Sequence, residues 1–355
     1  MRQYMNIVYH ASYISGMGRI RLNTEKITKL GLIALAISLF VLMLRGCAIA
    51  RGGYEGDSDA PTADGDDATV SIYNADTDKV YSLPLEEYVL RVTAAEMPAS
   101  FAEEALKAQS VAARTYTARK MASLGGKPCG KGGADVCTDS TCCQAYRTRE
   151  ELSEKWGSSA DMYFDKLSGA VSATRGVILT YNGKPIEALF HSSSGGMTED
   201  AANVFGGDAP YLKSVSSPGE EGFSRYSATV SFTRKQFANA VNAAIKGADI
   251  SKNKLEEQVK ILSKSESGRV TRLQLGGKTV TGRELRQALG LNSTAFTIEI
   301  SPERVVVSTR GYGHGVGMSQ YGAEAMAQRG ADYKEILLHY YTGAEIETID
   351  LGRIK

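Results

Sequence analysis

The chain has 355 residues, of which 43% are hydrophobic, and its 41 lysines and arginines nearly balance its 40 aspartates and glutamates. The formal net charge of +1 lacks the basic excess of a nucleic-acid-binding protein, so we expect no nucleic-acid partner. The apolar content excludes disorder of the whole chain, and five cysteines are too few for a small disulfide scaffold.

The N-terminal region predicts a membrane anchor. Residues 30–44 contain neither charge nor proline, and extension to residue 50 gives the roughly 20 residues that a transmembrane helix needs. No polar face recurs at helical spacing, which argues against a buried core helix. Residues 1–29 carry five basic residues and one acid, which places this tail in the cytoplasm and the rest of the chain outside. A cleaved signal peptide ending near Cys47, or a start further along at Met5 or Met17, is the alternative.

The chain then changes character. Residues 51–67 are acidic and lack apolar periodicity, so we expect a flexible linker. Alternating runs at 68–74 and 79–83 predict a hairpin. A helix is expected between Pro84 and Pro98, and a second, alanine-rich helix over 101–121. The glycine-rich residues 125–133 are expected to form a loop.

The remaining pattern mixes hairpins and helices. We expect two strands at 176–181 and 186–191 around an Asn-Gly turn, and a β pair at 296–300 and 304–308. Further strands are expected at 226–232, 258–264, 270–275 and 279–281. Helices are expected at 235–245, 282–289, 320–328 and 333–341. This order predicts an elongated α+β region over residues 68–348, with a smaller subdomain at about 217–296. Residues 349–355 would be a C-terminal tail.

Glu96 is the first candidate for chemistry. It falls at the end of the first predicted helix, directly before Met97-Pro98, where a helix–helix corner is expected. Partly apolar surroundings would raise the pKa of its carboxyl group and make it a proton donor. A solvent-exposed carboxylate at a helix end is the alternative. Gln109 and Tyr116 fall on one face of the second helix, where Gln109 could reach such a site.

Two further segments are rich in glycine and small polar residues. In HSSSGGMTEDAANVFGG, His191 precedes three serines and two glycines, a composition that suits a hydroxyl-rich ligand or a simple turn. GYGHGVGMSQYGAEAMA holds four glycines within seven residues around His314 and fits neither the P-loop nor the dinucleotide fingerprint. Its alternating glycines indicate backbone close to a ligand or to another strand. A Ser–His–acid triad using Ser192–Ser194 and His314 is a weaker alternative, because no G-x-S-x-G motif occurs.

Four segments together resemble a known family. LEEYVLRVTAAEMP, LKAQSVAARTYTA, HSSSGGMTED and GYGHGVGMSQYGA resemble, in order, the hallmark segments of the stage II sporulation protein D family of peptidoglycan lytic transglycosylases. The resemblance runs from about Val70 to Thr348 and includes the single N-terminal membrane segment. It implies cleavage of the linkage between N-acetylmuramic acid (MurNAc) and N-acetylglucosamine (GlcNAc), with a 1,6-anhydro-MurNAc product. The substrate would be glycan strands whose stem peptides an amidase has removed, during septal peptidoglycan remodelling and engulfment in sporulation.

The resemblance also implies roles for single residues. It places the essential acid at Glu96, which needs no cofactor, because one carboxyl can protonate the glycosidic oxygen and then deprotonate the muramyl C6 hydroxyl. A hydrolase would normally need a second carboxylate. The candidates for holding the sugars are Gln109, Arg114, Tyr116, His191, Ser192, Ser194, His314, Gln320 and Tyr321.

The resemblance further implies a location and partners. The protein would lie in the cell membrane at the septum between mother cell and forespore, with a sporulation amidase and a membrane protein of the engulfment machinery as partners. A non-catalytic glycan-binding scaffold that stimulates an amidase is the rival hypothesis, since relatives of this family have that role. A zinc hydrolase that uses His191 or His314 is a weaker third.

Four cysteines lie within fifteen residues, at Cys129, Cys137, Cys142 and Cys143. They could bind a structural Zn²⁺ ion in a tetrahedral site, and two disulfides are the alternative outside the cytoplasm. Members of the family that the chain resembles bind zinc in the corresponding loop through two histidines and two cysteines. Here Cys142-Cys143 replaces the His-Cys pair, and Cys129 would substitute from a shifted position. Either role is structural, because four protein ligands leave no open position for chemistry.

Overall fold

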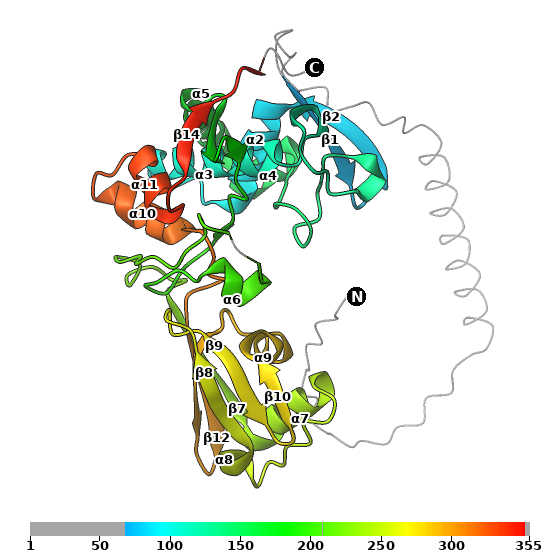
Figure 1. Ribbon diagram of the computed structural model, residues 1–355, viewed down its shortest axis with the longest axis vertical. Coiled ribbons are helices and arrows are strands. Elements are labelled where there is room, and N and C mark those ends of the chain that lie inside the picture. The colour runs from blue at the N-terminus through cyan, green and yellow to red at the C-terminus, as the bar shows by residue number, and fades with distance from the viewer. Residues whose placement is uncertain (1–67, 208, 352–355) are drawn as a thin grey trace, which may run out of the picture. The chain divides into compact units, whose positions relative to one another are not determined.

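The computed structural model describes residues 68–207 and 209–351 (Figure 1). The predicted cytoplasmic tail, membrane anchor and acidic linker lie outside these residues. Within the described part, no helix combines the length and apolar character needed to cross a membrane. Its sheets have two or three strands each, mostly antiparallel, with helices interspersed, so the predicted α+β class is confirmed.

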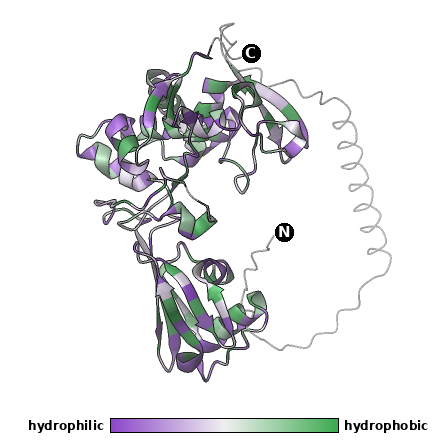
Figure 2. Ribbon diagram, viewed as in Figure 1, coloured by the Kyte–Doolittle hydropathy of each residue, from purple (hydrophilic) through white to green (hydrophobic). Residues whose placement is uncertain are grey.

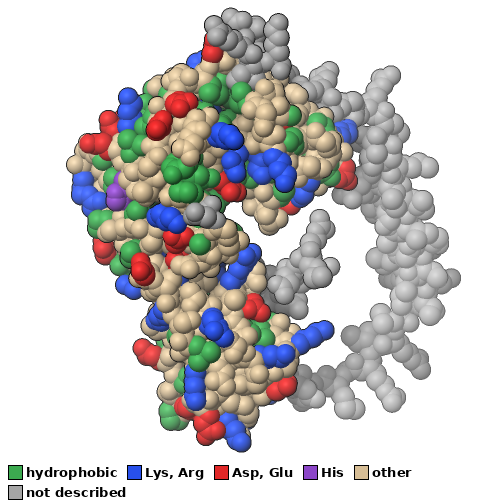
Figure 3. Space-filling model, in the orientation of Figure 1, with side chains coloured by type: hydrophobic (Ala, Val, Ile, Leu, Met, Phe, Trp, Pro, Cys, Tyr) green, Lys and Arg blue, Asp and Glu red, His purple; other side chains and the backbone are tan. Residues whose placement is uncertain are grey.

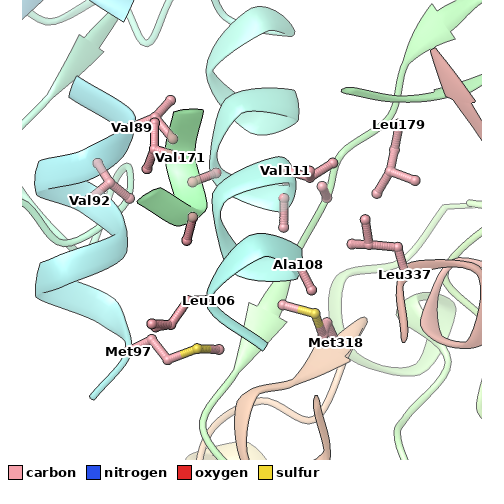
Figure 4. Packing of buried hydrophobic residues seen from close by; sticks show 14 of the residues in the cluster. Val89, Val92, Met97, Leu106, Ala108, Val111, Val171, Leu179, Met318 and Leu337 are labelled. Atoms are coloured by element: carbon pink, nitrogen blue, oxygen red, sulfur yellow. The ribbon is translucent and has the colours of Figure 1, made fainter. Parts of the chain in front are cut away.

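The first hydrophobic core surrounds helix α3 (Glu103–Ala118). Its alanines leave room for neighbouring elements on nearly every side, and most of its residues are buried. It contacts α2 (Leu85–Glu96), α5 (Ala160–Ala173), β4 (Val177–Tyr181), α10 (Gln320–Gln328) and α11 (Tyr333–Tyr340). Figure 4 shows side chains from α2, α5, β4 and α11 meeting around α3, with Leu106 next to Met97, which directly follows α2.

Short strands complete the first core. β1 (Thr69–Asn74) pairs antiparallel with β2 (Lys79–Pro84) and parallel with β3 (Val136–Cys137). β4 lies between β5 (Lys184–Pro185) and β14 (Glu345–Thr348), and β6 (Phe190–His191) pairs parallel with β13 (Met318–Ser319). The remaining short elements are α4 (Arg149–Trp156), α6 (Ala201–Phe205) and the 3-10 turns η1 (Ala122–Leu124), η2 (Lys131–Gly133) and η3 (Gly157–Ser159).

A second hydrophobic core lies between residues 237 and 307. One sheet has the order β11 (Ala295–Ile300), β12 (Arg304–Arg310), β7 (Ser227–Thr233), and the other the order β10 (Lys278–Thr281), β9 (Val270–Leu275), β8 (Val259–Lys264). Helices α7 (Arg234–Ala244), α8 (Leu255–Gln258) and α9 (Gly282–Leu289) pack with them. Hydrophobic and polar residues alternate along these strands (Figure 2). The β11–β12 pair extends this core beyond residue 296, where we expected the subdomain to end.

Most predicted elements occur within a few residues of their expected bounds, and 270–275, 282–289 and 320–328 have the bounds that we expected. The strand expected over 186–191 is present only at Phe190–His191. Residues 186–189 form no strand, because the chain leaves β4 after Ile186 and pairs with β13 from Phe190. Helices α4 and α5 lie in a stretch to which the pattern assigned no element. A signal for α4 was present, since Thr148 and Glu151 form a capping box.

Candidate active site and cysteine cluster

Glu96 ends α2 at a sharp corner. Met97 adopts an extended backbone before Pro98, a residue that disfavours helical geometry in its predecessor. The Glu96 side chain is partly buried, and the backbone amide of Ala145 donates a hydrogen bond to its Oε1 at 2.6 Å. Burial raises the pKa of the Glu96 carboxyl, and the amide hydrogen bond lowers it by less. Glu96 therefore holds its proton more readily than an exposed glutamate, in the direction that the sequence led us to expect.

Helix α10 holds this corner in place from a distant part of the chain. The ring of Tyr321 packs edge-to-face on Phe101 with centroids 5.1 Å apart. Glu324 accepts a hydrogen bond from the amide of Ala102 at 2.6 Å, where α3 begins without a side-chain cap of its own. Helix α10, which begins in the last of the four hallmark segments, thus fixes the loop that follows Glu96.

The four cysteines converge at one point. Their Sγ atoms all lie within 4.8 Å of one another, and all four are free thiols. The Asp139 carbonyl accepts hydrogen bonds from the amides of Cys142 and Cys143, at 3.0 and 2.9 Å, which folds the turn that brings these two back toward Cys137. Four converging sulfurs suit a tetrahedral metal site, so the donor set fits a metal ion. Zinc as its identity stays a prediction.

Burial makes two of these thiols, Cys137 and Cys143, less acidic in the absence of a metal. It raises the pKa of Cys137 to about 11 and that of Cys143 further. A bound cation would reverse this by stabilising the thiolates, so metal binding would release protons.

The cysteine cluster and Glu96 share one stretch of backbone. Ala145, whose amide contacts Glu96, follows Cys143 by two residues. Tyr116 donates a hydrogen bond to the Cys142 carbonyl at 3.4 Å, and Tyr146 stacks on Tyr88 of α2 with centroids 5.8 Å apart. The fold of the cysteine loop therefore determines where the Ala145 amide lies. The contact between Ala145 and Glu96 itself was not predicted, because it joins residues 49 positions apart.

The two glycine-rich segments meet each other. Ser193 and Tyr312 exchange backbone hydrogen bonds of 3.0 and 2.7 Å, next to the β6–β13 pair. Gly195 and Gly311 both have positive φ, and a Cβ atom on Gly195 would lie 2.7 Å from the Gly311 nitrogen. The glycines thus permit close approach to another strand, which is one of the two explanations that we expected.

Glu220 organises this junction and was missed by the sequence analysis. It is fully buried and accepts five hydrogen bonds, from the Ser193, Ser194, Ser217 and Ser319 hydroxyls and the Ser194 amide, at 2.6–2.9 Å. The Ser193 and Ser194 hydroxyls are therefore committed to a carboxylate rather than to a histidine. Among the described residues, no hydrogen bond joins a serine of this loop to His314, so the structure gives the Ser–His–acid alternative no support.

His191 and His314 form a ring pair with centroids 5.6 Å apart. His191 Nδ1 lies 3.1 Å from the Val316 carbonyl and so carries the proton, while His314 Nδ1 accepts from the Val316 amide at 3.1 Å. Burial, together with the positive charge of Arg269, lowers the pKa of His314 to about 4 and that of His191 well below its usual range. Both rings are therefore neutral at pH 7.

The other predicted sugar-binding residues differ in accessibility. Ser192, His314 and Tyr321 are partly exposed, whereas Gln109, Arg114, Tyr116, His191, Ser194 and Gln320 are buried. Gln320 donates a hydrogen bond to Gln109 at 3.3 Å, which joins α10 to α3. Arg114 forms two hydrogen bonds with Glu86, at 2.8 and 2.5 Å, and a third with the Val177 carbonyl. These contacts give Arg114 a structural role between α2, α3 and β4; direct sugar contacts by the other residues stay predictions.

Comparison with known proteins identifies the family. A family model described as "Stage II sporulation protein" matches residues 73–181, and one described as a domain of unknown function (DUF8618) matches residues 208–317. Stage II sporulation protein D of Bacillus subtilis is 40% identical over 291 residues, or 82% of each chain, and its namesake in Bacillus amyloliquefaciens is 38% identical over 290 residues, again 82% of each. The "Amidase enhancer" of Bacillus subtilis is 29% identical over 299 residues, 71% of this chain and 39% of that protein. The chain therefore belongs to the stage II sporulation protein D family, a family of sporulation proteins.

Proposed function

We propose that the protein is a lytic transglycosylase that cleaves the MurNAc–GlcNAc linkage of peptide-free glycan strands and leaves 1,6-anhydro-MurNAc ends. The observation that supports this most strongly is the Glu96 carboxyl at the α2–α3 corner. It is partly buried, its pKa is raised, and its Oε1 accepts one backbone amide. Its Oε2 has no hydrogen-bond partner among the described residues and is available to carry the proton.

A single carboxyl can perform both proton transfers. Protonated Glu96 donates its proton to the glycosidic oxygen while the bond from that oxygen to the muramyl C1 breaks and positive charge develops at C1. The carboxylate then removes the proton from the C6 hydroxyl, and O6 bonds to C1 and closes the anhydro ring. Glu96 ends protonated, as it began, and no water is consumed. The raised pKa favours the first step, because the acid must be protonated when substrate binds.

The cysteine cluster has a structural part in this proposal. Cys129, Cys137, Cys142 and Cys143 would hold a zinc ion that serves as a cross-link of the loop. The ion would not contact the substrate; its effect on the site would come from the loop, which positions the Ala145 amide against Glu96 Oε1.

The location and partners in the proposal rest on the sequence and on the relatives. The apolar residues 30–50 would anchor the chain in the cell membrane, with the catalytic region outside and facing peptidoglycan at the sporulation septum. Similarity to a protein named Amidase enhancer supports a link to a cell-wall amidase, which would supply the peptide-free strands. A membrane protein of the engulfment machinery would be a further partner, as the family resemblance implies.

Purified peptide-free strands provide the test. We expect the wild-type chain to release new anhydro-muramyl ends from them, and Glu96→Gln to release none above background, because glutamine cannot donate or accept the proton. Glu86→Gln is not a suitable control, since Glu86 binds the buried Arg114; Glu103→Gln, an exposed glutamate on the next helix, is suitable. Equal release by wild type and Glu96→Gln would rule out this role for Glu96.

A non-catalytic scaffold that stimulates an amidase is the second candidate, because the similarity to the Amidase enhancer covers 71% of this chain. The two proposals differ in what Glu96 is needed for. The scaffold predicts that Glu96→Gln stimulates an amidase as well as the wild type does, and that neither cleaves strands. The enzyme predicts strand cleavage by the wild type in the absence of any amidase.

A further inference from the structure

A cavity of about 880 Å³ lies where the two hydrophobic cores meet. Its walls come from α6 and Glu199 on one side and from β9, α9 and residues 290–294 on the other, with residues 312–314 between them. Glu96 is not part of its lining, but Thr141 of the cysteine loop is. Four extended residues span at most about 14 Å, and Thr141 precedes Ala145 by four, so the cavity lies near the Glu96 carboxyl.

Arg269 gives this cavity an unpaired positive charge. It is 2% exposed and lines the cavity; its Nη2 donates to the Ser194 carbonyl at 3.0 Å, while its Nε and Nη1 have no hydrogen-bond partner. Its guanidinium packs where a Cβ on Gly315 would lie 2.3–2.5 Å away, so that glycine makes room for it. Burial lowers the pKa of Arg269 to about 10, which leaves it protonated at pH 7. An unpaired buried cation is costly and calls for an anionic partner.

Two arginines of α9 add to this charge. Arg283 and Arg286 are three residues apart on one face of the helix, and both line the cavity. Among the described residues neither forms an ion pair, and Arg286 donates only to the Leu291 carbonyl, at 3.1 Å.

The one acid in the cavity wall, Glu199, forms no ion pair with these arginines among the described residues. Glu199 already accepts hydrogen bonds from the Asp200 amide, the Asn203 side chain, and the Ser265 and Ser267 hydroxyls. The lining residues thus carry three positive charges and one negative charge. The cavity is an anion-binding site by charge.

The apolar part of the lining favours a sugar as the carrier of the anion. Phe205 is 53% exposed and Tyr312 is 36% exposed, and both line the cavity. Large aromatic rings exposed at a cavity mark a binding surface, and their flat faces suit the C–H faces of a sugar ring. Arg225 lies 4.7 Å from the Tyr312 ring centroid and adds positive charge at the rim. Arginines beside exposed rings therefore suit an anionic saccharide.

We propose that this cavity binds the lactyl carboxylate of a peptide-free muramyl residue, and so selects strands from which the stem peptide has been removed. This inference rests on the proposed function, because it takes the substrate to be peptidoglycan. In intact strands the same carboxyl is an amide, which is neutral and extended by the peptide. The carboxylate would be held by Arg269, Arg283 and Arg286 through charge-assisted hydrogen bonds, and the muramyl ring would lie against Phe205 and Tyr312.

The test measures binding without turnover. The probe is a peptide-free GlcNAc–MurNAc tetrasaccharide, compared with the same tetrasaccharide whose lactyl carboxylates have been converted to amides. Both are titrated into the full chain carrying Glu96→Gln, in detergent micelles. We expect the carboxylate form to bind about tenfold more tightly at low salt, with the difference shrinking as salt screens the charges.

Arginine variants test whether the cavity causes the difference in affinity between the carboxylate and amidated forms. The double change Arg283→Gln and Arg286→Gln on α9 should lower the affinity for the carboxylate form and so remove most of the difference between the two forms. Arg272→Gln is the matched control, since Arg272 is an exposed arginine on β9 outside the cavity lining, and it should preserve the difference. Arg269→Lys, which keeps the charge but offers fewer donors, should reduce the difference in part.

Three results would overturn the inference: equal affinity for the two forms, equal effects of Arg272→Gln and the double change, or binding of a free stem peptide with the same arginine dependence. The last would assign the cavity to peptide carboxylates. Strand cleavage by the wild-type chain is measured separately. If the wild-type chain cleaves strands but binds the two forms equally, this inference is refuted and the proposed function stands. If the chain prefers the carboxylate form but cleaves no strands, the proposed function is refuted and the carboxylate site stands.

Discussion

Two glutamates that are shielded from solvent sit in contrasting regions of this protein. At the α2–α3 corner, Glu96 accepts one backbone amide and keeps one carboxyl oxygen without a partner. At the junction of the two glycine-rich segments, Glu220 is fully buried and accepts five hydrogen bonds. The first region leaves its carboxyl free to exchange a proton, whereas the second uses its carboxyl to hold segments together.

The difference shows that burial alone does not assign a role to a carboxyl group. The number and direction of the donors around it decide whether its ionised form is stabilised and whether any oxygen is left for a substrate. Charged side chains of both signs are interspersed over the face shown in Figure 3. The distinction between the two glutamates can be tested by a substitution at each position.

The largest expected effect is on turnover at Glu96. Glu96→Gln should lower the rate of strand cleavage by about a thousandfold or more, since general acid–base catalysis contributes about 10²–10⁴ and here one group serves both steps. The free energy of unfolding should stay equal or rise, because a partly buried group that resists ionisation is replaced by a neutral amide. The cleavage rate is measured on peptide-free strands, and the free energy of unfolding is measured by urea denaturation of the same samples. A folded variant that keeps its rate contradicts the assignment.

A substitution at Glu220 should have the opposite effects on turnover and stability. Glu220→Ala leaves five buried donors without their acceptor, which should cost about 3 kcal/mol or more of unfolding free energy. Cleavage per folded molecule should change little, because Glu220 has no free oxygen to offer a substrate. Denaturant titration measures the free energy of unfolding. Cleavage rates divided by the folded fraction of each sample measure turnover per folded molecule. Unchanged stability with lost turnover would reverse the roles that we assign to the two glutamates.

The cysteine loop should affect the Glu96 region at intermediate strength. Cys137→Ser should lower metal content and reduce strand cleavage by about tenfold, a typical cost of disturbing the support of a site, because the loop then positions the Ala145 amide less well. Elemental analysis and kinetics of one preparation measure both. Cys47→Ser, at the cysteine outside the cluster, is the control and should change neither. If metal is lost while the rate holds, the loop does not support Glu96.

The smallest effect concerns the pH profile. The Ala145 amide stabilises the ionised form of Glu96, so removing that donor with Ala145→Pro should raise the carboxyl pKa further. A general acid works while it is protonated, so the alkaline limb of kcat/KM should move to higher pH, by about one unit or less. Ala145→Gly keeps the amide and should leave the limb where it is. A shift to lower pH, or equal shifts in both variants, would contradict the role of this hydrogen bond.

The sequence predicted those parts of the molecule whose signals are local. Helix α9 follows from its own periodicity and its Thr281–Glu284 cap, and the corner at Glu96 follows from Pro98. The parts that it did not predict depend on contacts between distant segments. Ala145 reaches Glu96 over 49 positions, and Ser319 reaches Glu220 over 99.

Arg114 is a residue whose role depends on a tertiary contact that the sequence does not show. The family resemblance placed Arg114 among the sugar-binding candidates, yet its side chain pairs with Glu86, 28 positions away on another helix. A residue type indicates which chemistry is available, whereas the tertiary contacts decide whether that chemistry is used for the fold or for a ligand.

The masses of the products formed from defined peptide-free strands test the central claim most directly. A lytic transglycosylase closes the anhydro ring without consuming water, so its muramyl-ended products should be lighter by one water than those of a hydrolase. We predict anhydro-ended fragments from the wild-type chain and none from Glu96→Gln. Products that have gained a water, or no products from the wild type, would contradict the account.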